Sequence, residues 1–153
     1  MKLKTRHFGE IEIDESKIIE FDSGLPGFEN LKRFALFSED SDDDDGVKGL
    51  FWWLQSVDSG ETAFVLMDVL MVKEDYDPHV NEIELSSLGE YLPDDLLTFN
   101  IAIIPENLDD LTVNLRAPII INTVTKKGKQ VVVNDDQYAV KHYIYKEITS
   151  RNK

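Results

Sequence analysis

The sequence contains no cysteine. This excludes disulfide bonds, thiolate nucleophiles, and zinc or iron–sulfur sites with cysteine ligands. A chain without cysteine suits a reducing compartment, so we expect a cytoplasmic protein. The basic residues at the start are not followed by an apolar stretch, and no apolar run approaches the roughly 20 residues of a membrane span. We therefore expect neither an export signal nor a membrane anchor.

Linkers rich in proline, glycine or serine are also missing, as are internal repeats. A length of 153 residues is typical of one domain with one core. Hydrophobic residues make up 42% of the chain, which is too many for a disordered protein. We expect a single domain over residues 1–153, with the tail at about 149–153 as the candidate for disorder.

Basic residues are scarce, and their distribution is uneven. The chain has 16 of them against 30 acidic residues, and a formal net charge of -14. Residues 9–110 hold 27 acidic and 5 basic residues, whereas residues 111–153 hold 3 acidic and 8 basic ones. A surface this negative repels the phosphates of nucleic acids and attracts basic proteins. We expect no direct binding of nucleic acid.

Short runs rich in β-branched and aromatic residues, separated by turn residues, predict an all-β, mainly antiparallel fold. It is a small barrel-like or sandwich domain with one or two short helices. The pattern Ser87 to Glu90 predicts a helix start, residues 127–129 predict a hairpin turn, and residues 138–145 alternate as in a strand. Phe28, after the turn at residues 24–27, is expected to plug into the core. The expected strands are residues 8–13, 18–21, 34–37, 50–54, 63–67, 97–104, 111–115, 119–124, 130–133 and 138–145.

Four groups of residues, in this order along the chain, resemble the flagellar assembly factor (FliW) family. They are Gly24–Glu29; Leu54–Ser56 followed by Ala63, Phe64 and Asp68; Asn114–Asn122; and Gln130 with Tyr138. The resemblance covers nearly the whole chain. It departs from the family at Val69, where proline is usual, and in the acidic stretch Glu39–Asp45.

The resemblance implies a protein without enzymatic activity and without cofactors. Members of the family bind flagellin in the cytoplasm and, when free of it, bind the RNA-binding translational regulator CsrA. The regulator is then prevented from repressing flagellin synthesis. The acidity of this chain gives an independent physical reason for the second partner, because a protein that binds RNA has a basic surface. We expect a monomer.

Two other classes of function stay open from the residues alone. One is a small acidic metal-dependent hydrolase, and the other is a generic β-barrel interaction module. The acidic loop Asp40–Gly46 does not fit an EF-hand, because Ser41 would take the first ligand position and Trp52 the position of the bidentate glutamate. The three histidines, His7, His79 and His142, lack metal-ligand spacing. We therefore predict no metal site.

Two regions are candidates for binding a partner. Adjacent side chains of a strand point to opposite faces, so Trp52 and Trp53 are expected to divide between the core and a partner, unless both pack inside. Of the two, Trp52 is the candidate contact. The second region offers an aromatic ring among carboxylates, and its candidate residues are Lys73, Glu74, Asp75, Tyr76, Asp77 and Pro78.

Overall fold

The computed structural model describes residues 1–38 and 49–151. Short strands joined by turns and loops form the framework of this structure. The strands are β1 Lys2–Thr5, β2 Gly9–Glu12, β3 Ile18–Glu20, β4 Arg33–Ser38, β5 Phe51–Ser56, β6 Ala63–Met67, β7 Leu96–Ile103, β8 Thr112–Val113, β9 Ile119–Asn122, β10 Lys127–Gln130 and β11 His142–Tyr143. The helices are α1 Glu82–Leu85 and α2 Tyr145–Arg151, and 3₁₀ turns lie at Glu15–Lys17, Val69–Met71, Ser86–Leu88, Pro93–Asp95 and Leu108–Asp110.

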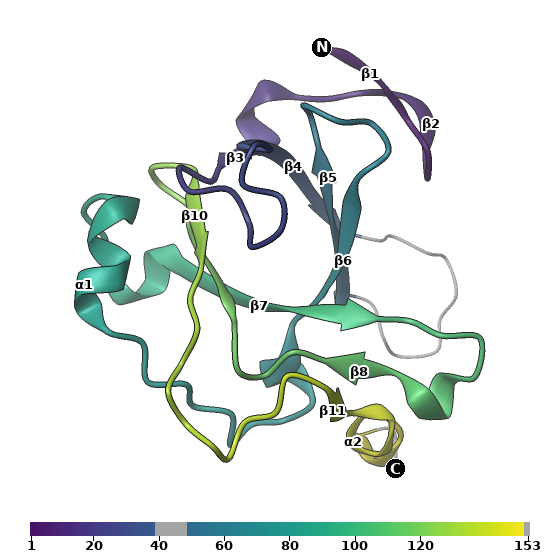
Figure 1. Ribbon diagram of the computed structural model, residues 1–153, viewed down its shortest axis with the longest axis vertical. Coiled ribbons are helices and arrows are strands. Elements are labelled where there is room, and N and C mark those ends of the chain that lie inside the picture. Colours follow the sequence, from purple (N-terminus) through teal and green to yellow (C-terminus); the bar gives the residue numbers. More distant parts are fainter. Residues whose placement is uncertain (39–48, 152–153) are drawn as a thin grey trace.

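A closed barrel of seven strands forms the centre of the molecule. It closes because β7 pairs with β6 on one edge and with β9 on the other. The ring runs β7-β6-β5-β4-β3-β10-β9 and closes where Leu96–Phe99 of β7 pairs with β9. Each pairing in this ring is antiparallel except that of β3 with β10. Strands β8 and β11 continue the sheet past the barrel beside the second half of β7 (Figure 1). The predicted all-β fold is confirmed.

The barrel interior is filled by alternate residues of its strands, as the pleat requires. The buried side chains from the strands are Ile19, Phe34, Leu54, Leu66, Phe99, Ile119 and Ile121, and the segment that follows β3 adds Phe21 and Leu25. Strand β10 contributes Gly128, where a Cβ would lie 2.6 Å from the Cζ atom of Phe21. Glycine at this position therefore lets β10 pass close to the phenyl ring.

One end of the barrel is closed by the turn at residues 24–28. Gly24 has a φ of +65°, and a Cβ there would lie 2.6 Å from the Cα of Glu29, so the turn requires glycine. Leu25 points into the interior and is 1% exposed. Phe28 is 41% exposed and rests on the ring of Phe64, with centroids 5.2 Å apart. The prediction that Phe28 plugs the core is wrong, because Leu25 already fills that space.

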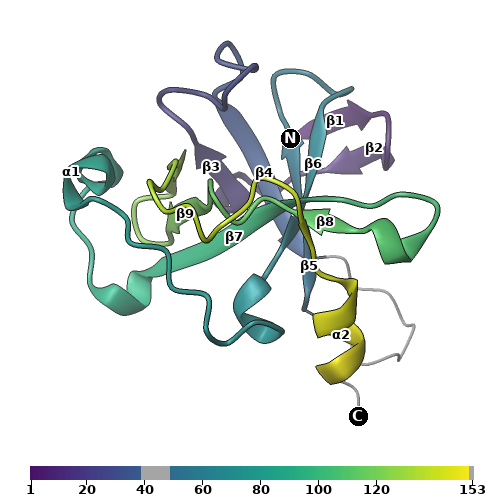
Figure 2. The ribbon, with the colours of Figure 1, turned by 60° about the horizontal axis from the view of Figure 1, so that its bottom comes forward.

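A second core lies outside the barrel, on the outer face of β6, β7 and β8. Met67, Ala102 and Val113 face outward from these strands and are buried. The C-terminal segment crosses them, with α2 at its end (Figure 2). Ile148 of α2 and Ile144, the residue just before the helix, are buried in this core, and the Ile148 N–H donates a hydrogen bond to the Ile144 carbonyl. This packing holds the helix in place.

Helix α1 begins earlier than the sequence predicts. Asn81 is its N-cap, since the Asn81 Oδ1 atom accepts a hydrogen bond from the N–H of Ile83. The capping pattern at Ser87 instead falls in a 3₁₀ turn that follows α1 and ends at Gly89. Leu85 and Leu88 pack on the outer side of β9. The buried apolar side chains therefore decide where this helical segment lies, and the local pattern at Ser87 does not.

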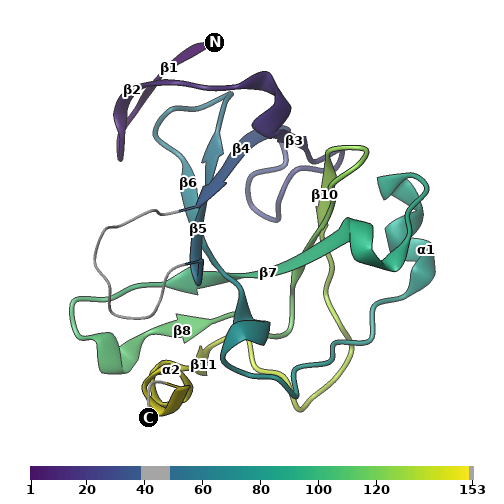
Figure 3. The ribbon, with the colours of Figure 1, turned by 180° about the vertical axis from the view of Figure 1, so that it is seen from behind.

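The N-terminal hairpin β1–β2 is a separate sheet against the outside of the barrel (Figure 3). Phe8, in the hairpin, contacts Phe37 and Trp53 with centroid distances of 5.0 Å in both cases. Trp52 faces the barrel interior and contacts Phe99 at 5.4 Å. The two tryptophans thus point to opposite sides of β5, and the hairpin lies over the outer one.

Two further expectations about local structure are wrong. The hairpin turn predicted at 127–129 lies earlier, ending at Lys126, and residues 127–129 belong to β10. The strand predicted over 138–145 is reduced to His142–Tyr143, because the chain turns into α2 at Tyr145. Residues 149–151, part of the predicted tail, lie in α2. The acidic stretch Glu39–Asp45 lies outside the described residues.

Candidate functional site

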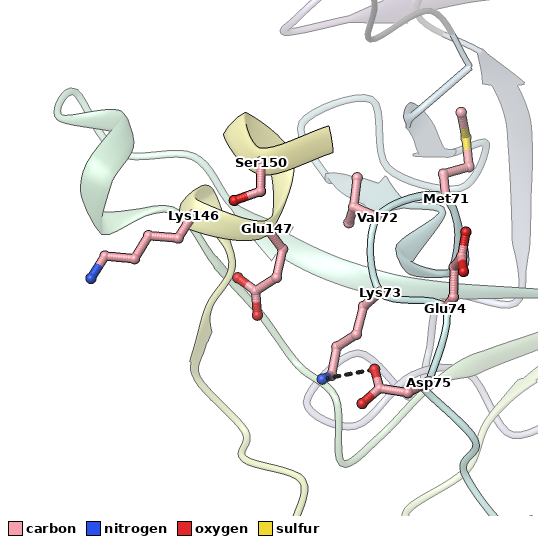
Figure 4. A pocket seen from close by; sticks show the side chains of 8 residues that line it. All are labelled: Met71, Val72, Lys73, Glu74, Asp75, Lys146, Glu147 and Ser150. Carbon is pink, nitrogen blue, oxygen red and sulfur yellow. Dashed lines mark hydrogen bonds and ion pairs between the residues drawn. The ribbon is translucent and has the colours of Figure 1, made fainter. Parts of the chain in front are cut away.

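An open groove of about 710 Å³ lies between the segment that follows β6 and helix α2. Figure 4 shows its two walls, which come from distant parts of the sequence. One wall is formed by Met71, Val72, Lys73, Glu74 and Asp75, and the other by Lys146, Glu147 and Ser150. The groove is therefore an exposed surface that joins two elements packed on the same outer core.

Tyr76 anchors the first wall to the body of the protein. Its hydroxyl donates a hydrogen bond to the Leu115 carbonyl at 2.6 Å and accepts one from Asn100 Nδ2 at 2.9 Å. The ring of Tyr138 packs against it at 4.9 Å. Burial raises the pKa of Tyr76 to about 12, although the bond from Asn100 acts in the opposite direction. Tyr76 thus fixes the position of the groove residues next to it.

Tyr76 is 3% exposed, so its ring does not reach the surface. It was expected to contact a partner, and this expectation must be corrected. The same sequence pattern, an aromatic residue between charged neighbours, also fits a loop that is exposed except for one buried aromatic anchor. Tyr138 supports the same loop, because its hydroxyl accepts a hydrogen bond from the N–H of Asp77 at 2.9 Å.

The groove carries charges of both signs. Lys73 Nζ forms an ion pair with Asp75 Oδ1 at 3.1 Å, and the Asp75 side chain is 81% exposed (Figure 4). On the opposite wall Glu147 Oε1 lies 2.8 Å from His142 Nε2. Glu74 is exposed beside them. Partially exposed pairs of this kind contribute little stability, so the charged groups are available to a partner at small cost.

The structure brings together some of the predicted contact residues and separates others. Lys73, Glu74 and Asp75 line the groove. Asp77 is exposed, with His79 Nε2 at 3.9 Å from its carboxylate, and Pro78 is half-buried beside it. Trp52 belongs to the barrel interior instead, and its Nε1 donates a hydrogen bond to the Gly49 carbonyl. The predicted set therefore divides between two places in the fold.

Sequence reasoning missed the second wall of the groove, because the alternation at residues 138–145 predicts a strand and the residues after it predict a disordered tail. The signal for a helix was present. Ile144 and Ile148 have helical spacing, and Glu147 lies between them on the polar side. A seven-residue helix is too short to give a clear periodic pattern, so its existence depends on the outer core that it covers.

The described residues contain neither a cluster of metal-binding side chains nor a membrane-spanning helix. Among residues 1–38 and 49–151, no three histidine, aspartate or glutamate side chains lie close enough together to hold a metal ion. The pair His142–Glu147 supplies two such groups only. No helix within these same ranges is both long and apolar enough to span a membrane. The calcium-loop hypothesis concerned residues 40–46, which lie outside the described residues.

The fold and this surface define a class of small closed β-barrel protein with an open, charged groove on its side. The family model described as FliW protein matches residues 2–144. The chain is 41% identical to the flagellar assembly factor FliW of Alkaliphilus metalliredigens, over 97% of this chain and 88% of that protein. It is 39% identical to the FliW of Lachnoclostridium phytofermentans, over 100% of this chain and 96% of that protein.

A solved structure agrees with these sequence comparisons. The crystal structure of a flagellar assembly factor FliW superposes with a TM-score of 0.82 at 32% identity, covering 94% of this chain and 96% of that one. This chain therefore belongs to the FliW family of flagellar assembly factors. The resemblance found in the sequence is confirmed. The name of the family describes an assembly factor and not an enzyme.

Proposed function

We propose that this protein binds flagellin in the cytoplasm and, when free of flagellin, binds the RNA-binding regulator CsrA as a monomer. Binding of CsrA would relieve its repression of flagellin synthesis. The observation that supports this proposal most is the match to the FliW family over residues 2–144, because the resemblance to that family implies both partners.

The charge of the surface supports the second partner on physical grounds. Residues 9–110 carry 27 acidic and 5 basic side chains. Glu74, Asp75 and Asp77 lie exposed at or beside the groove. A regulator that binds RNA has a basic surface, and complementary charge accelerates the encounter of two proteins. The loop is also held in place by Tyr76, so little ordering is needed when a partner binds.

Size-exclusion chromatography of purified proteins tests the proposal. The 17.5-kDa chain is mixed in turn with flagellin and with CsrA from the same organism, at micromolar concentration. We expect co-elution with each partner, and displacement of CsrA when flagellin is added in excess. If the chain elutes alone in both mixtures, the proposal is contradicted. The alternative function, an interaction module with other partners, would then be favoured.

A charge-matched pair of variants tests the groove itself. Glu74→Gln, Asp75→Asn and Asp77→Asn together remove three carboxylates beside the groove. A control variant removes three exposed carboxylates elsewhere, at Glu10, Glu15 and Asp94. We expect the groove variant to bind CsrA more slowly than the control variant. Equal association rates would show that charge acts through the whole surface, and that the loop with Glu74, Asp75 and Asp77 has no special role.

A further inference from the structure

The two ends of the barrel differ. The end near the start of β4 and β6 is closed by the buried side chain of Leu25 and by Phe28, which rests on Phe64. At the opposite end, a cavity of about 120 Å³ opens between β3, β4, β5, β7 and β9. Leu36, Trp52 and Ile121 are among the apolar side chains that line it. The mouths of small barrels are frequent sites for ligands.

Two lysines, Lys17 and Lys126, lie at the polar edge of this mouth. Neither ammonium group has an ion-pair or hydrogen-bond partner among the residues that the structure describes. Other lysines nearby are paired, Lys127 with Asp22 at 3.1 Å and Lys129 with Glu84 at 2.7 Å. In a chain with a net charge of -14, two lysines at one apolar cavity concentrate positive charge locally, although Lys17 also interacts at longer range with the carboxylate of Asp14.

The backbone conformation at Lys126 also singles out this residue. Lys126 is the one described non-glycine residue with a positive φ, at 60°. Its N–H donates to the Asn122 carbonyl and its carbonyl accepts from the N–H of Glu20, both at 2.9 Å, so the conformation is fixed from both sides. Glycine or asparagine fits this region of φ more easily than lysine does. The long cationic side chain is therefore present at a position that does not favour it.

We propose that this open end of the barrel binds a small amphipathic acid, with a branched alkyl group or single ring inside the mouth and one carboxylate between the lysines. The size follows from the cavity, since an apolar cavity of about 150 Å³ holds one benzene molecule. A nucleotide or a long acyl chain is too large for it. The charge follows from Lys17 and Lys126, and the apolar part from Leu36, Trp52 and Ile121.

Tryptophan fluorescence tests the proposal, because Trp52 lines the mouth and Trp53 lies on the other side of β5. In a Trp53→Phe variant the emission comes from Trp52 alone. Titration with isovalerate is expected to change this emission in a saturable way. Isovaleramide has the same shape without the charge, and we expect it to bind at least about tenfold more weakly, since it gains no ion pair with either lysine.

Lysine variants provide the control. Lys17→Gln and Lys126→Gln should each raise the dissociation constant of isovalerate about fivefold, whereas Lys129→Gln, at the paired lysine, should leave it unchanged within about twofold. Lys126→Gly relieves the backbone strain, so it should weaken binding while the melting temperature stays equal or rises. Equal binding of acid and amide, an unsaturable signal, or an equal effect of Lys129→Gln would overturn the proposal.

Discussion

Replacing Tyr76 by phenylalanine tests the claim that this residue anchors the groove from inside. The substitution keeps the ring and removes only the hydroxyl. That hydroxyl donates to the Leu115 carbonyl at 2.6 Å and accepts from Asn100 Nδ2 at 2.9 Å, in a site where Tyr76 is 3% exposed. Asn100 keeps its second bond, to the Asn114 carbonyl at 2.8 Å. The main loss is therefore the partner of the buried Leu115 carbonyl.

The expected cost follows from that carbonyl. A buried polar group without a partner costs about 1–3 kcal/mol, and we expect Tyr76→Phe to lower the free energy of unfolding by about 2 kcal/mol. For a chain of this size, that corresponds to a fall of roughly 4–8 °C in melting temperature. Chemical denaturation monitored by circular dichroism measures the change directly.

A matched variant separates this effect from a general effect of removing a tyrosine hydroxyl. Tyr143 is 62% exposed, so its hydroxyl is solvated, and Tyr143→Phe is expected to change the free energy of unfolding by less than about 0.5 kcal/mol. Equal stability of the two variants would show that the Tyr76 hydroxyl contributes no net stabilisation.

The pH dependence of stability provides a second readout. Burial raises the pKa of Tyr76 from 10.0 to about 12, so the folded protein favours the neutral phenol. The stabilisation is complete below pH 10 and is lost as the pH rises towards 12. Wild-type protein should therefore lose stability across this range more steeply than Tyr76→Phe does. Parallel profiles would show that another group governs the loss.

Three further predictions concern other parts of the chain. Burial acts to raise the pKa of Asp58, but hydrogen bonds from the N–H groups of Lys32 and Arg33 outweigh it and lower the pKa. Asp58→Ala should therefore lower the free energy of unfolding by about 1 kcal/mol at neutral pH. The difference, measured by urea denaturation, should shrink as the pH falls below 3.8. Gly128→Val should cost about 1–3 kcal/mol, because its side chain overlaps the Phe21 ring, and a stable variant would contradict the packing. Glu147→Gln should change the free energy of unfolding by less than about 1 kcal/mol in urea denaturation, because its pair with His142 is partly exposed, and a larger loss would contradict the small contribution of this pair.

The sequence predicted the barrel well, because its strands are short and bounded by turn residues. The hairpin of β5 and β6 was found from two apolar runs separated by a turn-forming set, and its register is Leu54 with Phe64. Closure of the barrel was not predictable in this way. It depends on β7, because the first half of this strand pairs with β9 and its end pairs with β8 on the same edge. No local sequence pattern indicates that one strand edge pairs with two other strands.

The candidate site was predicted only in part, because the sequence shows which residues are neighbours along the chain but not which are brought together by folding. Charged residues that lie close in sequence, such as Glu74 and Asp75, are also close in space. Side chains from the other wall, such as Lys146 and Glu147, become neighbours only through the outer core beneath α2. Burial of Tyr76 likewise depends on Asn100 and Leu115, which are distant in sequence. Tertiary packing thus decided which side chains of the loop are exposed.

The proposed recognition of a basic protein depends on the anionic surface of the barrel. The most direct measurement is the association rate of this chain with CsrA as the sodium chloride concentration rises, in the wild type and in the variant without the carboxylates of Glu74, Asp75 and Asp77. We predict that the wild-type rate falls steeply with salt and that the variant starts slower and falls less. An association rate that is independent of salt and equal for both proteins would show that these carboxylates do not guide the encounter with CsrA.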